Sequence, residues 1–259
     1  MKRKQKARTF VMGDIHGAYK ALDQCLQRAG LDYSSDVLIQ LGDVVDGYDQ
    51  VFECVEELLK IKNLIAIRGN HDAWLNDFLT TDFHPFYWTY GGKGTLLSYL
   101  KHTGNKGVII PTGSGFKTSL NASDIPLAHR EFFKYQKPFY IDKEQRCFVH
   151  GGFNLSMPFL EQAQSVYYWD RDLWLDAMSF SGSGASAEEF EMETKFKEIY
   201  IGHTPTTNWN IDKPMTVLNI TNLDTGAGHQ GKLTIMDINS KEYWQSDPLG
   251  ELYEKNHRS

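Results

Sequence analysis

The N-terminal part of the chain alternates between short apolar runs and amphipathic segments. The apolar runs are rich in β-branched residues, stop at turn residues and therefore predict buried strands: Thr9–Met12, Val37–Leu41 and Leu64–Ile67. After the first run, apolar residues recur at helical spacing up to Gly30, which is expected to cap that helix. A second helix is predicted from about Gln50 to Lys62. This alternation predicts a parallel sheet covered by helices.

The middle of the chain, residues 78–137, departs from this alternation. It is rich in aromatic side chains and is punctuated by glycines. We expect a mostly helical, cap-like insertion beside the functional site, within a single domain that spans residues 1–259.

The second half of the chain returns to strands and turns. The glycine- and serine-rich stretch Ser179–Ala187 predicts a loop, and an acidic helix is expected at Glu188–Glu193. Strands are predicted at Arg146–Val149, at Glu198–Ile201, near Met215–Ile220 and near Lys232–Ile238.

Polar residues of the types that bind metals follow several of these strands. They are Asp14 and His16 in Gly-Asp-Ile-His-Gly, Asp43 and Asp46 in Gly-Asp-Val-Val-Asp-Gly, Asn70 and His71 in Gly-Asn-His-Asp, His150, and His203. Any one of these sites alone is typical of an ordinary turn. Because ligands bind beyond the carboxyl ends of strands in such sheets, the shared strand-then-turn setting predicts that all of them converge at one edge.

The residue types at these positions suit a pair of metal ions. Two divalent cations about 3.5–4 Å apart need a bridging carboxylate, and imidazoles with carboxylates suit Mn, Fe or Zn. The absence of cysteine from the set argues against a closed structural zinc site. The pattern therefore favours a catalytic binuclear centre.

Composition narrows the choice of partners and compartment. The chain has 259 residues and a net charge of −6, which argues against a duplex nucleic-acid partner held by phosphate neutralisation. No apolar run reaches the length of a bilayer crossing and no secretory signal is visible, so we expect no membrane partner. Cys25, Cys54 and Cys147 show no paired spacing. This favours structural packing in a reducing compartment, and hence a cytoplasmic protein.

The ordered motifs resemble those of the calcineurin-like metallophosphoesterase superfamily. Within it, they are most similar to the phosphoprotein phosphatase branch, which includes bacterial serine/threonine protein phosphatases and symmetrical diadenosine tetraphosphatases. The late sequence Asp224-Thr225-Gly226-Ala227 also resembles this branch. The resemblance implies a layered α/β/β/α sandwich with mixed sheets and a helical cap insertion.

The resemblance also implies a role for each residue of the site. Its metal ligands would be Asp14 and His16 for one ion, Asp43 as the bridge, and Asn70, His150 and His203 for the second ion. His71 would protonate the leaving oxygen, Asp46 would orient His71, and a metal-bridging hydroxide would attack phosphorus. The cofactor would be two divalent ions, with Mn as the first expectation and Fe, Zn or Ni as alternatives.

One position departs from the branch. Its members continue Val-Asp with Arg-Gly, and that arginine binds phosphate, whereas this chain has Gly47 after Asp46. We expect Arg171, in Trp169-Asp170-Arg171, to supply the missing phosphate contact, and Arg68 and Lys93 are weaker candidates. Asn70 is also expected near the substrate.

Three functions remain open at this point. The first is a phosphomonoesterase like the serine/threonine protein phosphatases, which acts on a phosphoprotein or a small phosphate ester. The second is hydrolysis of dinucleoside polyphosphates or other nucleotides. The third is a metal-binding scaffold without catalysis, which the intact set of His71, Asp46 and ligands disfavours.

Overall fold

The computed structural model describes residues 7–85, 88–104, 107–113, 115–184 and 186–258. Its first sheet has the order β12-β11-β1-β2-β3. The strands are β1 (Thr9–Met12), β2 (Val37–Gln40), β3 (Asn63–Ala66), β11 (Thr234–Asp237) and β12 (Tyr243–Gln245). β1, β2 and β3 are parallel, whereas β11 and β12 run antiparallel to their neighbours. The sheet is therefore mixed.

The second sheet has a parallel centre and antiparallel edges. Its order is β6-β7-β8-β10-β9. The strands are β6 (Phe139–Ile141), β7 (Arg146–Val149), β8 (Glu198–Ile201), β9 (Met215–Val217) and β10 (Ile220–Asn222). The three central strands, β7, β8 and β10, are parallel. The carboxyl ends of these central strands therefore share one edge.

The two sheets pack face to face through alternate residues of their strands. Val11 of β1 and Ile39 of β2 lie in one apolar cluster with Phe148 of β7 and Tyr200 of β8. The rings of Phe148 and Tyr200 stack with centroids 5.0 Å apart. Neighbouring residues on each strand point the other way, toward helices. This period of two places a buried core on both faces of each sheet.

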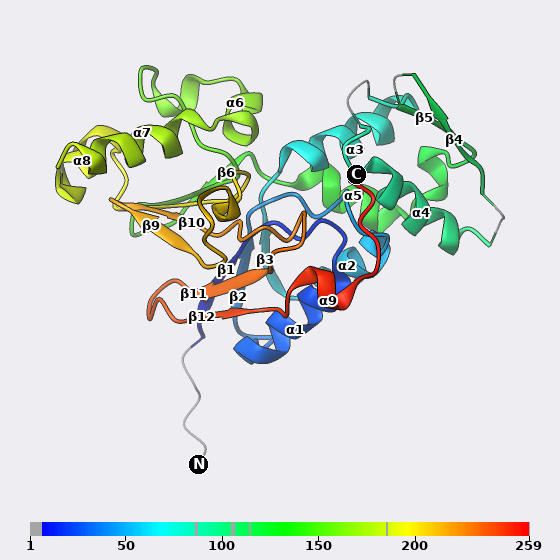
Figure 1. The fold of residues 1–259 in the computed structure, drawn as a ribbon, viewed down its shortest axis with the longest axis horizontal. Coiled ribbons are helices and arrows are strands. Elements are labelled where there is room, and N and C mark those ends of the chain that lie inside the picture. Colours follow the sequence, from blue (N-terminus) through cyan, green and yellow to red (C-terminus); the bar gives the residue numbers. More distant parts are fainter. Residues whose placement is uncertain (1–6, 86–87, 105–106, 114, 185, 259) are drawn as a thin grey trace, which may run out of the picture.

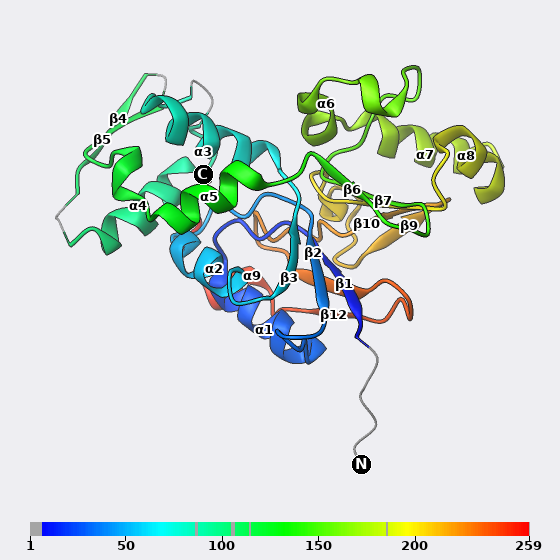
Figure 2. The same ribbon diagram turned by 180° about the vertical axis from the view of Figure 1, so that it is seen from behind.

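Helices cover the outer faces of the sandwich, as Figures 1 and 2 show. The first sheet carries α1 (Tyr19–Ala29), α2 (Val51–Leu58) and α9 (Leu249–Leu252), and the second carries α6 (Gln164–Trp169), α7 (Asp172–Gly182) and α8 (Ala187–Thr194). α3 (Asn70–Thr81) follows β3. The predicted α/β/β/α layering with mixed sheets is confirmed.

Residues 78–137 form a separate lobe beside α3, apart from positions 86–87, 105–106 and 114, which lie outside the described residues (Figure 1). The lobe holds α4 (Gly92–His102), β4 (Ile109–Thr112), β5 (Gly115–Thr118) and α5 (Leu127–Tyr135). β4 and β5 pair antiparallel, so the lobe is not purely helical. α4 contacts α2, and α5 contacts α3.

Three local predictions were wrong. The helix expected to reach Lys62 ends at Leu58, before the turn that precedes β3. The loop expected from Ser179 begins later, because α7 is anchored by buried Leu173, Trp174 and Ala177 and continues to Gly182. The strand expected near Met215–Ile220 is a hairpin of β9 and β10, since Leu218 takes a positive φ of 53°.

Across the described ranges, no helix combines the length and the apolar character that crossing a membrane would require.

Candidate metal centre

The predicted ligands and catalytic residues gather at the shared carboxyl edge of the two sheets. They come from the turns after β1 (Asp14, His16) and β2 (Asp43, Asp46), the start of α3 (Asn70, His71), and the turns after β7 (His150) and β8 (His203). All eight residues are buried, with at most 5% of their surface exposed. The convergence inferred from strand-end positions is therefore present in the tertiary structure.

The backbone at this edge is held in an uncommon conformation. Four non-glycine residues of the site have positive φ: His16 (53°), Asp43 (54°), Asp46 (65°) and His203 (66°). Residues in the left-handed region cost on the order of 1–3 kcal/mol each and tend to cluster at functional sites. The fold therefore accepts local strain to place these four side chains.

Two glycines let the turns approach one another. A Cβ at Gly202 would overlap Oδ1 of Asp14, and a Cβ at Gly42 would lie 2.8 Å from Nδ1 of His150. Gly42 also has a φ of 104°, which side-chain-bearing residues rarely adopt. These positions explain why glycine precedes Asp43 and His203 in the sequence.

Asp43 lies at the centre of the site. Among the described residues, two compact groups have ligand atoms within 4.8 Å of one another: His16, Asp43 and His71, and Asp43, His150 and His203. Oδ2 of Asp43 is 3.7 Å from Nε2 of His16 and 3.4 Å from Nε2 of His150. Asp43 thus stands between the two groups, where a bridging carboxylate is needed.

Asp14 and Asn70 sit at the margins of these groups. Oδ2 of Asp14 is 3.8 Å from Nε2 of His16, and Oδ1 of Asn70 is 3.1 Å from Nε2 of His150. The first compact group contains His71 in place of Asp14, which the sequence did not lead us to expect. A ring nitrogen of His71 therefore lies close enough to His16 and Asp43 to bind the same metal ion.

Backbone carbonyls engage Nδ1 of two imidazoles, whose Nε2 atoms face Asp43. Nδ1 of His16 bonds to the carbonyls of Val45 (3.0 Å) and Asp46 (2.9 Å), and Nδ1 of His150 bonds to the carbonyl of Leu41 at 2.8 Å. A backbone acceptor at Nδ1 fixes the ring and directs Nε2 toward a metal. Nε2 of His203 is buried and has no hydrogen-bond partner among the described residues. An orphaned buried nitrogen of this kind fits a metal ligand.

The charges of the site also fit cations. Burial, reinforced by Asp224 and Asp43, raises the pKa of Asp14 well above its usual value. Burial likewise raises the pKa of Asp224 to about 6. Burial lowers the pKa values of His16 and His203 well below the ordinary histidine value. His150 differs, because Asp43 and Asp14 outweigh its burial and raise its pKa to about 9. Crowded carboxylates beside the neutral imidazoles of His16 and His203 form a ligand set that divalent cations would stabilise.

His71 is oriented by a buried carboxylate. Its Nδ1 lies 2.8 Å from Oδ2 of Asp46. Asp46 in turn accepts hydrogen bonds from Nε1 of Trp88 (2.9 and 3.0 Å) and from the hydroxyl of Thr95 (2.6 Å). Trp88 and Thr95 belong to the lobe of residues 78–137, and sequence reasoning did not single them out. The lobe therefore fixes the predicted acid through Asp46.

The two arginines proposed from the sequence have different positions. Nη1 of Arg171 donates to the carbonyl of His203 (2.9 Å) and to Oγ1 of Thr204 (2.8 Å), and Arg171 lines the central cavity. Arg68 does not line it. Its Nη2 donates instead to the carbonyls of Phe133 and Lys134 in the last turn of α5, which attract a cation. Arg68 therefore lies outside the cavity lining, and its role in substrate binding stays a prediction. Lys93 is also absent from the cavity lining.

Four further residues line the central cavity, which has a volume of about 90 Å³: Pro205, Asp224, His229 and Arg258. Asp224 follows β10, so the strand-then-turn pattern could have identified it. Arg258 lies near the C-terminus, and no motif or periodicity in the sequence points to it. Its guanidinium reaches Nε2 of His16 and Nε2 of His71, both at 3.0 Å.

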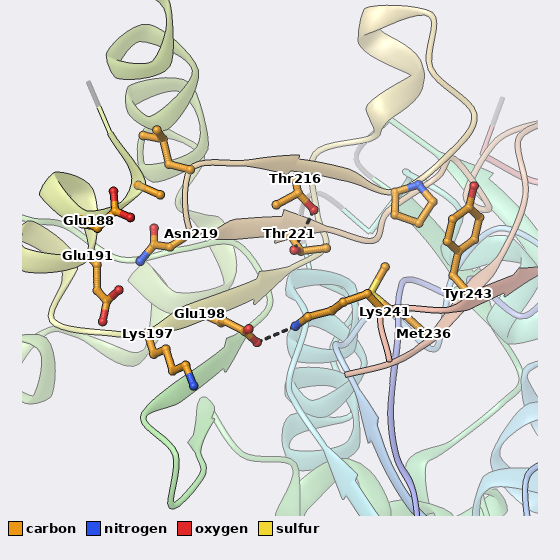
Figure 3. A pocket seen from close by; sticks show the side chains of 13 residues that line it. Glu188, Glu191, Lys197, Glu198, Thr216, Asn219, Thr221, Met236, Lys241 and Tyr243 are labelled. Carbon is orange, nitrogen blue, oxygen red and sulfur yellow. Dashed lines mark hydrogen bonds and ion pairs between the residues drawn. The ribbon is translucent and has the colours of Figure 1, made fainter. Parts of the chain in front are cut away.

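A larger cavity of about 450 Å³ lies between α8 and the strands β8 to β10 (Figure 3). Its charged residues include Glu188, Glu191 and Lys197, and Nζ of Lys241 pairs with Oε2 of Glu198 at 2.7 Å. None of the predicted ligands lines it. Size therefore does not identify the reactive site here, and the ligand chemistry is confined to the smaller central cavity.

Comparison with known proteins agrees with this geometry. The model of the family described as calcineurin-like phosphoesterase matches residues 7–207. Serine/threonine-protein phosphatase 1 of Salmonella typhimurium is 24% identical over 238 residues, which cover 88% of this chain and 91% of the relative. A symmetrical bis(5'-nucleosyl)-tetraphosphatase of Pasteurella multocida is 32% identical over 68 residues, only 26% of this chain and 25% of the relative. A crystal structure provisionally called a diadenosine tetraphosphatase shares the fold, with a TM-score of 0.61, 16% identity and 95% of each chain covered.

Proposed function

Because this chain belongs to the calcineurin-like phosphoesterase family, we propose that it is a phosphomonoesterase of the serine/threonine protein phosphatase type. The protein is a metal-dependent phosphoesterase, and the proposal concerns its substrate. The match to a protein phosphatase runs along nearly the whole chain, whereas the match to a tetraphosphatase covers about a quarter of it. Similarity along the full length favours the first substrate class.

The observation that carries the proposal is the small size of the reactive cavity. Its volume is about 90 Å³, while sites that enclose a drug-sized ligand measure roughly 300–1,000 Å³. Such a cavity accommodates a phosphoryl group and leaves the rest of the substrate outside. A phosphorylated side chain on a protein surface meets this requirement.

We assign the ligands as the sequence predicted. The first ion would be held by Asp14, His16 and Asp43, and the second by Asp43, Asn70, His150 and His203. When bound, two divalent cations activate a water molecule and neutralise the charge of the phosphoryl oxygens. Manganese is our first expectation for both positions.

His71 and Asp46 would move the proton. Asp46 accepts from Nδ1 of His71, so that Nε2 faces the cavity. A carboxylate on the far nitrogen holds the imidazole in one tautomer and one orientation. Nε2–H of His71 would then donate its proton to the leaving oxygen of the ester, which departs as an alcohol.

A second candidate, hydrolysis of dinucleoside polyphosphates, is favoured by an aromatic surface beside the cavity. The ring of Trp74 lies 4.7 Å from that of His71 and 5.5 Å from that of Trp169. Trp169 is 44% exposed. Exposed aromatic rings stack nucleobases, so this pair could hold a base outside the cavity.

A hydrolysis screen of the manganese-loaded protein tests both candidates. It should compare an aryl phosphate, a phosphoserine peptide and a dinucleoside tetraphosphate, with metal content measured on the same samples. We expect two metal ions per chain, loss of activity after chelation, and a higher kcat/KM for the monoesters. Preferential cleavage of the tetraphosphate would select the second candidate. Two bound metal ions without hydrolysis of any substrate would support a metal-binding scaffold without catalysis.

Arg171→Ala is expected to lower kcat/KM about tenfold or more, because hydrogen bonds to charged groups are worth about 1.5–3 kcal/mol and about 1.4 kcal/mol corresponds to a tenfold change. Steady-state kinetics on the best substrate would measure this. Metal content should be measured too, since Arg171 also holds the carbonyl of His203. Arg28→Ala, which removes an arginine paired with Asp247 on the surface, is the control. Unchanged kinetics in Arg171→Ala would exclude a substrate contact.

A further inference from the structure

The C-terminal segment delivers a cationic side chain into the reactive cavity. In Figures 1 and 2 the chain leaves α9 and ends beside the lobe, near α3 and α5. Arg258 lies on this segment, and its Nη1 and Nη2 atoms are each 3.0 Å from an imidazole, of His16 and His71 respectively. Arg258 and Arg171 are the arginines that line the cavity within the described part of the chain.

Three glycines leave the space that Arg258 occupies. A Cβ at Gly91 would lie 2.8 Å from Cγ of Arg258, and a Cβ at Gly228 would overlap its Nη1. A Cβ at Gly47 would be 3.7 Å from its Cδ, so the side chain runs directly past that position. Each glycine belongs to a different segment of the chain. Together they form a channel that a larger residue at Gly91 or Gly228 would obstruct.

The backbone of the C-terminal segment is fastened beside this channel. The amide of His257 donates to the carbonyl of Gly47 at 2.8 Å, and Nδ2 of Asn256 donates to the carbonyl of Gly228 at 2.9 Å. The ring of Tyr253 packs on that of Tyr48, with centroids 4.4 Å apart. The contacts of His257 and Tyr253 tie the segment to the loop after β2 that carries Asp43 and Asp46, and the contact of Asn256 ties it to the loop after β10. These contacts fix the backbone of the segment where the side chain of Arg258 can reach the cavity.

We propose that Arg258 is a substrate-binding residue that contacts the phosphoryl group, taking the place that Gly47 leaves without a side chain. This inference rests on the proposed phosphatase function. A guanidinium has only donors, and its planar fork matches the oxygens of a phosphate. In the structure its acceptors are the Nε2 atoms of His16 and His71. Metal binding by His16 and protonation of His71 would occupy both nitrogens, so the guanidinium would need another acceptor. A phosphoryl group would offer charged oxygens, to which hydrogen bonds are roughly twice as strong as between neutral groups.

Binding of inorganic phosphate to the manganese-loaded protein tests this role without relying on turnover. Isothermal titration should show that Arg258→Ala weakens phosphate binding at least about tenfold, as expected for the loss of a charge-assisted contact. Metal content should stay unchanged, and Arg258→Lys should recover part of the affinity. Added guanidinium ion should restore phosphate binding in Arg258→Ala and should leave the phosphate affinity of the wild type unchanged. Lys255→Ala, on the exposed part of the same segment, is the matched control.

Two results would overturn the inference. Wild-type affinity for phosphate in Arg258→Ala, at unchanged metal content, would show that the contact does not serve the substrate. Tighter phosphate or metal binding in that variant would show that the segment obstructs the site. Because phosphate binding is measured separately from hydrolysis, a failed substrate screen would count against the phosphatase function alone.

Discussion

Asp43→Asn is expected to remove nearly all hydrolysis, on the order of 10³-fold or more, since water activation by divalent cations is the main contribution available to this site. Asp43 is the one residue shared by the two compact ligand groups. The backbone amide of His71 donates to Oδ1 of Asp43 at 2.9 Å. Asparagine has the same size and keeps an oxygen that can accept this hydrogen bond. The variant therefore removes the negative charge with little change in shape.

Metal analysis and kinetics on the same sample measure this effect. We expect fewer than two metal ions per chain in Asp43→Asn, with a thermal midpoint close to that of the metal-free wild type. Asp36→Asn is the matched control, because Asp36 is a carboxylate of similar burial just before the opposite end of β2 and pairs with Arg8. A fully loaded Asp43→Asn variant with wild-type turnover would disprove the bridging role.

His71→Asn is expected to lower kcat by about 10²–10⁴-fold, the usual contribution of general acid–base catalysis. The loss should grow with the basicity of the leaving oxygen. An alkoxide needs a proton to depart, whereas an activated phenolate does not. A series of aryl and alkyl phosphates would measure this dependence. An equal loss across the series would contradict the role of acid.

The structure makes metal content the decisive second measurement for this variant. His71 lies in a compact group with His16 and Asp43, close enough to act as a ligand itself. If His71 is the acid, the variant should still bind two metal ions. If His71 is a ligand, the variant should bind fewer. His129→Asn is the matched control, because His129 is also buried and also bonded to a carboxylate, that of Glu56 at 2.7 Å, yet lies outside the cavity lining.

The lobe of residues 78–137 takes part in this arrangement. Trp88 and Thr95 donate to Oδ1 of Asp46, the carboxylate oxygen that is not bonded to His71. Asp46 would otherwise be a buried carboxylate with unpaired acceptors, which is costly. The lobe thus sets the orientation of His71 without contributing a residue to the predicted ligand set.

The sequence by itself determined the sandwich and the edge at which the site forms. Strands such as β1 and β8 are short apolar runs that stop at glycine, and their boundaries are set by local composition. Parallel strands align their carboxyl ends, so Asp14 and Asp43 had to meet at one edge of the first sheet. His203 joins them because the second sheet packs face to face against the first. Asp224 follows the same rule after β10. Its motif was recognised in the sequence, but its place in the site was not, because its strand was merged with β9.

Tertiary structure decided where each candidate cation lies. The sequence favoured Arg171 over Arg68, and only the fold shows that Arg68 lies near the carbonyl end of α5 while Arg171 lines the cavity. Arg258 depends on contacts between segments 242 and 187 residues apart, and on space left by Gly47, Gly91 and Gly228. Periodicity reports on neighbours within one strand or helix. A side chain that fills a gap formed by three distant turns leaves no such signal, because that gap exists only after the chain has folded.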